Sequence, residues 1–408
     1  MPNRPQPHRI LAAIGPGLLV AATGVGAGDL ATAGFAGSRM GIAVLWAVAL
    51  GALLKFALTE GIARHQLATN DTLLEGACRH LGRWVGVVFL VYLLPWSFFT
   101  GGALVNAAGA AAHAIVPVFE RPAHDKVLFG IASSAAGLLL VWLGGFRVFE
   151  RVMAACVAIM FLCVVLVGAW LLLAERAVGA AVVGLLVPRI PHDAAQPGSF
   201  HESLSWTLAL LGGVGGTVTI LCYGYWMREE NRSGHADLRL SRWDLGVGYL
   251  ATALFGMAMI VIANGTTIEG KGVALIARLG DHLGAVAGPV VRWGFLIGAW
   301  AAVASSLLGV WQSVPYLFAD TLRIVSARRA PTSTDRSLEV KPERDRLDRT
   351  IPYRAFLLAI ATLPLVTLWI DFKAVQKTYA IAGAFFLPLL AAALLVLNRR
   401  AVVGATLR

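Results

Sequence analysis

A single acidic residue lies inside the first long apolar segment of the chain, at the end of a glycine cluster. This stretch reads Thr23-Gly-Val-Gly-Ala-Gly-Asp29. Because glycine has a low helix propensity, clustered glycines favour a break in a helix. A carboxylate beside the carbonyl groups that a break frees offers hard oxygen ligands for a cation, or a site that can carry a proton. A structural role is equally open, because Asp29 could cap the helix that follows it.

A second glycine cluster interrupts a later apolar segment, Leu211-Gly-Gly-Val-Gly-Gly-Thr-Val-Thr219. The hydroxyl groups in and after it could face Asp29 across a cavity, although hydroxyls in helices commonly bond to their own backbone. The amide of Gln312 could line the same cavity, or pack around the proline that follows at position 315. We therefore predict a substrate site made of Thr23, Gly24, Gly26, Asp29, Thr217, Thr219, Tyr223 and Gln312.

Two more charged residues, Lys55 and Glu60, lie in the second apolar segment. Glu60 is nearer the polar end of the segment, where a charged side chain can reach water or a partner. Lys55 lies deeper, and it could pair with Glu60 or with Asp29, or take part in proton movement. We predict that Lys55 and Glu60 form either a structural ion pair, which is the favoured interpretation, or a proton site.

The composition places these residues in a membrane. The chain of 408 residues is 58% hydrophobic and only 14% charged, too little polar surface for a soluble domain. Its apolar runs are long and show no alternation with period two, which excludes a β-barrel. About ten stretches are long enough to cross a bilayer as helices. We place them near 11–37, 41–67, 85–116, 127–143, 146–174, 203–227, 243–267, 285–319, 353–372 and 375–397.

The two glycine clusters fall at matching places, the first span of each set of five. Paired interrupted spans are the sequence signature of transporters built from inverted repeats, because freed backbone groups at mid-membrane are tolerated only where protein, water or substrate satisfies them. Close helix packing is the competing explanation of either cluster alone. We predict one repeat over 1–200 and a second over 201–408, with a cytoplasmic loop at 321–352.

The net charge of +11 is explained by the membrane topology and does not indicate a nucleic-acid partner. Lysine and arginine collect in the segments that ten spans with both ends inside would leave in the cytoplasm. We therefore predict a multi-pass protein of the inner, or plasma, membrane with both termini cytoplasmic. Its expected partners are the lipid bilayer and a small cargo, and a monomer is compatible with the sequence.

Catalytic and cofactor-binding motifs are not recognisable in the sequence. We find no phosphate loop, nucleophile elbow, nucleotide fingerprint or His/Cys set with zinc spacing, so we predict neither an enzyme nor a cofactor. The four cysteines are scattered singly and predict neither disulfides nor a thiolate metal site.

The sequence resembles the Nramp family of divalent metal transporters. The resemblance starts at Gly15-Pro-Gly17, runs through Thr23-Gly-Val-Gly-Ala-Gly-Asp-Leu-Ala-Thr32 and persists at Thr69-Asn-Asp-Thr-Leu-Leu-Glu75. It implies a leucine-transporter-like fold of two inverted five-helix repeats with helices one and six broken. It also implies uptake of manganese, iron or related divalent ions, often together with protons.

The chain departs from the family signatures at the metal site. The family motif Asp-Pro-Gly-Asn corresponds to Gly26-Ala-Gly-Asp29, so Gly26 stands at the position of the metal-binding aspartate and Asp29 at that of the asparagine. The Met-Pro-His motif of the sixth span corresponds to Val218-Thr-Ile220. Without a soft thioether ligand, magnesium or manganese is favoured over iron, with Asp29 and Gly26 as metal ligands.

Two alternatives to metal transport stay open. The same fold could carry an amino acid or another small organic solute, because the amino ends of half-helices favour carboxylate groups. The chain could also be a membrane sensor that does not transport.

Overall fold

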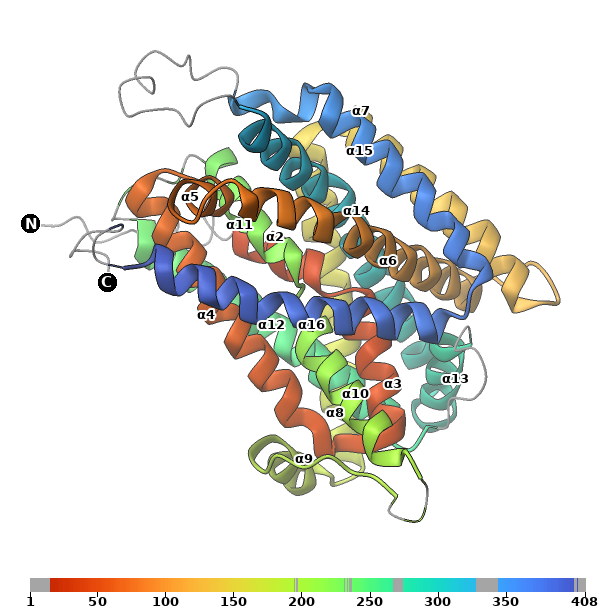
Figure 1. The fold of residues 1–408 in the computed structure, drawn as a ribbon. Helices are drawn as coiled ribbons and strands as arrows, with labels where there is room; N and C mark the ends of the chain where they lie inside the picture. The colour runs from red at the N-terminus through yellow and green to blue at the C-terminus, as the bar shows by residue number, and fades with distance from the viewer. Residues whose placement is uncertain are drawn as a thin grey trace, which may run out of the picture.

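The computed structural model describes residues 15–193, 195, 197–230, 232, 234, 237–266, 274–327, 344–399 and 402. These residues form helices of the α, 3-10 and π types joined by short turns, with no strand among them (Figure 1). Long apolar runs fold this way in a bilayer because a helix satisfies its own backbone hydrogen bonds.

The helices of the first half follow the predicted spans. They are α2 (Pro16–Gly24), η1 (Ala27–Thr32), α3 (Ala33–Met40), η2 (Gly41–Val44), α4 (Leu45–Thr69), α5 (Leu73–His80), α6 (Trp84–Ile115), α7 (Pro122–Met160), η3 (Phe161–Val165), α8 (Leu166–Ala174) and α9 (Val178–Leu186).

The second half repeats the pattern of a broken span followed by long helices. Its elements are α10 (Ser199–Gly213), η4 (Val218–Leu221), α11 (Cys222–Glu229), α12 (Asp237–Ala263), α13 (Leu275–Ala287), α14 (Pro289–Ser326), η6 (Arg344–Arg349), α15 (Ile351–Thr362), η7 (Leu363–Trp369) and α16 (Phe372–Leu397).

Nine helical segments of the described chain are long and apolar enough to cross a membrane. The sequence predicted about ten, and the difference lies at the first span. The segment Asp29–Thr69 joins the second half of the first predicted span to the second span, while α2 is too short to count alone. The bundle is therefore all-helical and multi-spanning, as predicted.

The first span is broken at the first glycine cluster. Helix α2 ends at Gly24, residues 25 and 26 form a turn, and the chain re-enters helix as the π-helical η1 before α3. Gly26 has φ −151° and ψ −120°, which is not helical. The predicted break is present.

The sixth span is broken at the second glycine cluster. Helix α10 ends at Gly213, and the chain resumes as η4 at Val218. Gly215 and Gly216 have φ of +75° and +79°, a region that glycine enters without the steric cost that a Cβ imposes. The cluster therefore both ends α10 and allows the reversal.

The broken helices lie at the centre of the bundle. In the most apolar window of Ser199–Glu229, 78% of the residues are buried inside the protein, against 17% for Pro122–Gly144. Helix α2 contacts both α11 and α12 within the bundle, whereas α7 and α15 run together along one side (Figure 1). Large apolar side chains point outward on the peripheral helices, as a bilayer requires: Leu53, Val91, Leu143, Leu173, Phe385 and Leu395.

The predicted cytoplasmic loop at 321–352 is helical where the structure describes it, except at residues 327 and 350. Residues 321–326 complete α14, residues 344–349 form η6, and α15 begins at Ile351. The remainder of the loop, 328–343, lies outside the described residues.

Candidate functional site

The two helix breaks meet backbone to backbone. A Cβ placed on Gly24 would lie 2.5 Å from the carbonyl carbon of Gly215 and 2.7 Å from the nitrogen of Gly216. Only a residue without a side chain permits this approach. The structure thus brings Gly24, predicted as a site residue, to the second glycine cluster.

Asp29 lies at this junction and is fully buried. Its Oδ2 accepts a hydrogen bond of 3.1 Å from the backbone nitrogen of Gly215, an amide that the break in the sixth span frees. Its Oδ1 has no hydrogen-bond partner among the described residues, and it lies 3.2 Å from where a Cβ on Gly256 would stand. Asp29 therefore caps the opposite break rather than the start of its own half-helix, whose N-cap is Gly26.

Lys55 reaches the same junction from α4 and is also fully buried. Its Nζ donates to the carbonyl oxygen of Gly212 at 2.9 Å and to that of Val214. The acidic and the basic side chain therefore bind neighbouring backbone groups of one break, Asp29 an amide and Lys55 two carbonyls. The charges of the junction balance.

Hydroxyl groups of α14 donate hydrogen bonds to the carbonyl groups of the first break. Ser306 Oγ donates to the oxygen of Thr23 at 2.6 Å, and Ser305 Oγ donates to that of Ala22 at 3.2 Å. A Cβ on Gly26 would lie 2.1 Å from Ser306 Cβ. Ser306 thus fills the place that a side chain at position 26 would need.

The carbonyl groups of Gly24 and Gly26 accept hydrogen bonds from their own chain. Gly26 N donates to Gly24 O at 3.1 Å, and Leu30 N donates to Gly26 O at 2.8 Å. Each carbonyl oxygen keeps one further lone pair. Gly26 can therefore bind a ligand only through the remaining lone pair of its carbonyl oxygen.

The three predicted threonines line the junction on other sides. Thr23 Oγ1 is buried without a partner among the described residues and lies close against Gly309 of α14. Thr217 Oγ1 accepts a hydrogen bond of 3.0 Å from Trp96 Nε1 of α6. Thr219 Oγ1 lies 2.5 Å from where a Cβ on Gly216 would stand.

Tyr223 and Gln312 lie elsewhere, a turn or more from the breaks. Tyr223 donates to Asp244 Oδ2 at 3.3 Å, in a buried cluster with Arg232. Gln312 Oε1 accepts from Trp226 Nε1 at 3.1 Å. Among the described residues, these side chains bond to Asp244, Arg232 and Trp226, and neither bonds to Asp29.

Glu60 does not pair with Lys55. Arg64 Nη2 lies 2.8 Å from Glu60 Oε2, and Arg242 Nε lies 2.8 Å from Glu60 Oε1. Glu60 therefore forms ion pairs with two arginines near the polar end of α4. Its predicted partner Lys55 binds backbone carbonyls instead.

Several residues of the junction escaped the sequence-based prediction. Ser305 and Ser306 could have been suspected as adjacent hydroxyls in an apolar span. Trp96 and Gly256 carried no such signal, because tryptophan and glycine are common in membrane helices for unrelated reasons.

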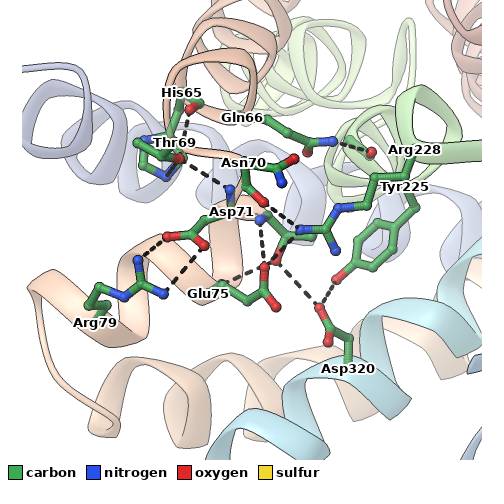
Figure 2. A network of polar contacts seen from close by, with 12 residues as sticks. His65, Gln66, Thr69, Asn70, Asp71, Glu75, Arg79, Tyr225, Arg228 and Asp320 are labelled. Carbon is green, nitrogen blue, oxygen red and sulfur yellow. Dashed lines mark hydrogen bonds and ion pairs between the residues drawn. The ribbon is translucent and has the colours of Figure 1, made fainter. Parts of the chain in front are cut away.

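A second polar cluster joins side chains from three helices (Figure 2). Glu75 of α5 accepts from Arg228 of α11 through Oε2 and from Arg323 of α14 through Oε1, both at 2.8 Å. Arg323 also lies 2.7 Å from Asp320 Oδ1, and Tyr225 donates to Asp320 Oδ2 at 2.6 Å. We call these five residues the Glu75 network. It ties α5, α11 and α14 together.

The Glu75 network is held in place by the segment between α4 and α5. Thr72 and Glu75 form a capping box at the start of α5, with Thr72 N donating to Glu75 Oε2 at 2.9 Å. Arg79 pairs with Asp71 on the same segment, and Arg228 donates to Asn70 O at 3.1 Å (Figure 2). This reciprocal capping fixes the carboxylate that both arginines bind.

The described residues contain no group of three or more His, Cys, Asp and Glu side chains that could hold a metal ion. The four cysteines are free. Cys78 of α5 lies outside the membrane-spanning segments, and burial raises the pKa of its thiol. Any cation at the helix junction would therefore meet one carboxylate and neutral oxygens.

The paired helix breaks, the all-helical bundle and its apolar exterior define a multi-pass membrane protein with the leucine-transporter-like fold. The family model described as natural resistance-associated macrophage protein-like, Nramp, matches residues 17–407. The chain belongs to the Nramp family, as the resemblance in its first two spans implied. Membership of a family of transporters fits the expectation that the chain is not an enzyme.

Solved structures support the fold. A manganese transporter of Eremococcus coleocola superposes with a TM-score of 0.69 at 17% identity, covering 100% of this chain and 83% of its own. MhsT in complex with L-phenylalanine gives a TM-score of 0.56 at 17% identity, covering 93% and 87%. Mhp1, a nucleobase-cation symporter, gives 0.52 at 14% identity, covering 93% and 75%.

Two curated relatives are distant. An uncharacterized protein of Pasteurella multocida is 20% identical over 295 residues, covering 72% of this chain and 64% of the relative. The divalent metal cation transporter MntH of Granulibacter bethesdensis is 25% identical over 317 residues, covering 72% and 65%. The matches thus span less than two thirds of the relatives.

Proposed function

We propose that this protein is a secondary transporter that takes up a divalent metal cation by alternating access, with magnesium or manganese favoured over iron. One observation carries the proposal. Asp29 Oδ1 is a buried carboxylate oxygen without a partner in the described chain, at the point where two broken helices meet. A buried acceptor of this kind is costly unless a ligand or water satisfies it in part of the working cycle.

The donor set supports a hard, partly hydrated ion. Asp29 supplies one carboxylate, Thr23 supplies a buried hydroxyl without a partner, and the carbonyl of Gly26 has one further lone pair. Thr217 and Thr219 border the junction and are proposed to bind through water. Oxygen-only ligands suit magnesium and manganese, whereas iron gains more from the soft ligand that the chain lacks.

The proposed metal ligands are closed off in this conformation. Thr23, Asp29 and Thr217 are all buried, so cargo reaches them only when part of the bundle moves. Alternating access meets this requirement if one bundle of helices rocks against a scaffold formed by the other helices, within the proposed repeats 1–200 and 201–408.

The proposed orientation places both termini on the cytoplasmic side of the inner, or plasma, membrane. Gly17 N at the start of α2 donates to Asp244 Oδ2, and Asn398 Nδ2 after α16 donates to Gly61 O. These contacts and the arginines of the Glu75 network lie at the same end of the bundle. An end rich in arginine is favoured on the cytoplasmic side.

Uptake into proteoliposomes tests the proposed site. Asp29→Asn keeps the shape of the side chain and removes its charge, and we expect at least about a tenfold loss of magnesium and manganese uptake, since a charge-assisted ligand is worth more than about 1.4 kcal/mol. Asp281→Asn is the matched control, because Asp281 is 65% exposed and pairs with Arg292 at the surface. Equal uptake by the wild type and Asp29→Asn would exclude Asp29 as a ligand.

Transport of a small organic solute is the second candidate. It is favoured by the balanced charges of Asp29 and Lys55, which suit a zwitterion better than a dication. A thermal-shift panel of divalent ions against amino acids separates the two. Stabilisation by an amino acid and by no metal would replace the first proposal, and the absence of saturable uptake of either cargo would favour a sensor.

A further inference from the structure

The carbonyl groups at the end of α10 form a cation-binding position that Lys55 fills. Gly212 O lies 2.9 Å from Lys55 Nζ, and Val214 O accepts from the same nitrogen. In an unbroken helix these oxygens would accept from the backbone nitrogens four residues later, at 216 and 218. The left-handed turn at Gly215 and Gly216 removes those donors.

Carbonyl oxygens that converge on one point within a membrane attract a positive charge. The two carbonyl groups direct the negative ends of their dipoles at Lys55 Nζ, and water does not reach this nitrogen because the residue is fully buried. The carboxylate of Asp29 lies beside them, bonded to the next amide of the same turn at Gly215. A neutral donor would satisfy the hydrogen bonds, but only a cation also balances the carboxylate.

The neighbouring elements contribute neutral groups to this position. Thr59 of α4 donates to the carbonyl of Lys55 itself at 2.8 Å, and it shares a hydrogen bond of 2.6 Å with the hydroxyl of Tyr249 on α12. The Cδ of Lys55 lies 3.6 Å from where a Cβ on Gly215 would stand. The aliphatic stem therefore packs against the break while the ammonium reaches the carbonyls.

We propose that the ammonium of Lys55 is a built-in substitute for a free monovalent cation, bound by the carbonyl groups of Gly212 and Val214. The tethered cation holds the broken sixth span without sodium or potassium from solution. One consequence of this proposal rests on the proposed function. If the protein takes up a cargo, that uptake needs no monovalent co-ion at the position of Lys55.

Chemical rescue tests the position without any transport measurement. Lys55→Ala removes the ammonium and leaves space for a free ion. Purified variants are heated in ammonium, sodium or potassium chloride, and in choline chloride of equal ionic strength as the reference. We expect Lys55→Ala to have a lower Tm than the wild type in choline, and to gain on the order of 2–4 °C, saturably, with at least one small cation. The wild-type Tm should not depend on which cation is present.

Two control variants make the result specific. Lys55→Met fills the space without a charge, so its Tm should fall without any rescue by small cations. Lys126→Ala removes another buried lysine, which donates to the carbonyl of Ile370 far from the breaks, and it should also show no cation-specific rescue.

The proposal is overturned if the Tm of Lys55→Ala is the same in all four salts, or if Lys126→Ala is rescued equally. It is also overturned if Lys55→Ala cannot be purified in any salt while Lys55→Met folds, because the carbonyls would then have failed to take a free cation. None of these results involves the cargo. A negative rescue result therefore does not contradict the proposed function, and a negative uptake result does not contradict the proposed cation position at Lys55.

Discussion

Gly24 and Gly215 are in backbone contact across the two broken helices, with 2.5 Å between the position of a Cβ on Gly24 and the carbonyl carbon of Gly215. The contact joins the first span of one half to the first span of the other. A displacement of one break must therefore displace or release the other, because packed backbone does not yield as flexible side chains do. This is the point at which a movement of one repeat would be transmitted.

A methyl group at this contact should disable the protein. We predict that Gly24→Ala loses uptake and has a Tm several degrees lower, since overpacking against backbone costs about 1–3 kcal/mol or more. Gly294→Ala on α14 is the control, because a Cβ there meets nothing within 4 Å and alanine favours helix. A Gly24→Ala protein with normal Tm and uptake would show that the two breaks separate freely.

The family aspartate should not be tolerated at position 26 without a second change. We predict that Gly26→Asp alone destabilises the protein, because its Cβ would lie 2.1 Å from Ser306 Cβ. The double variant Gly26→Asp with Ser306→Gly removes this clash and places a second carboxylate beside Asp29. It should recover Tm relative to Gly26→Asp and bind manganese at least about tenfold more tightly than the wild type, by calorimetry.

Ser306→Gly alone is the control for that pair. It should show no gain in manganese affinity, because it adds no carboxylate. If the double variant is no more stable than Gly26→Asp, then Ser306 is not what excludes a side chain at position 26.

The helix breaks could be predicted from the sequence because their cause is local. Clustered glycines weaken a helix wherever they stand, and both breaks formed at the clusters that include Gly24 and Gly215. The burial of Asp29 between them followed from the cost of a charge in an apolar segment. These inferences needed no knowledge of contacts between distant residues.

The partners of Lys55 could not be predicted, because they are backbone atoms. The sequence offers acidic side chains as candidates, and Glu60 pairs with arginines instead. Carbonyl oxygens are present at every residue, so only the fold shows which are freed. The partner of Tyr223 could not be predicted for a related reason: four residues past Thr219, a helix has advanced about 6 Å, and the hydroxyl of Tyr223 donates to Asp244.

Glu60 should prove dispensable for transport. Its ion pairs lie near the polar end of α4, and the side chain of Arg242 is 49% exposed. We predict that Glu60→Gln lowers the free energy of unfolding by about 1–2 kcal/mol, because Glu60 is buried and its arginine partners are partly exposed, and leaves uptake unchanged at every pH tested. Loss of the pH dependence of uptake in this variant would instead make Glu60 a proton site.

Gly256 should control access to the unpartnered oxygen of Asp29. Alanine there would place a methyl group 3.2 Å from Asp29 Oδ1 and 3.0 Å from a methyl of Val48. Both contacts are tight but can be relieved by small shifts, so we predict a folded protein with a raised KM for the cargo and little change in Tm. Gly246→Ala on the same helix meets nothing within 4 Å and is the control. An unchanged KM would mean that cargo does not approach Asp29 from this side.

The Glu75 network should keep its own end of the bundle closed. Glu75 binds Arg228 and Arg323 at once, so Glu75→Gln leaves two cations without their shared carboxylate. Both arginines are partly exposed, which limits the cost to about 1–2 kcal/mol, or up to about thirtyfold in the population of the open state. Cys222 at the start of α11 is fully buried and reports this opening. We predict that a water-soluble maleimide labels it at least about tenfold faster in Glu75→Gln than in the wild type, measured by peptide mass spectrometry.

Glu202→Gln is the matched control for this opening. Glu202 pairs with Arg39 at 3.0 Å, and it lies near the start of α10, at the opposite end of the broken span from Arg228. Losing that pair removes one carboxylate–arginine contact without touching the Glu75 network, so the rate of Cys222 labelling should match the wild type. Equal acceleration in both variants would indicate general loosening of the bundle. No acceleration in Glu75→Gln would show that α5, α11 and α14 stay together through their apolar packing, and that another contact holds this end closed.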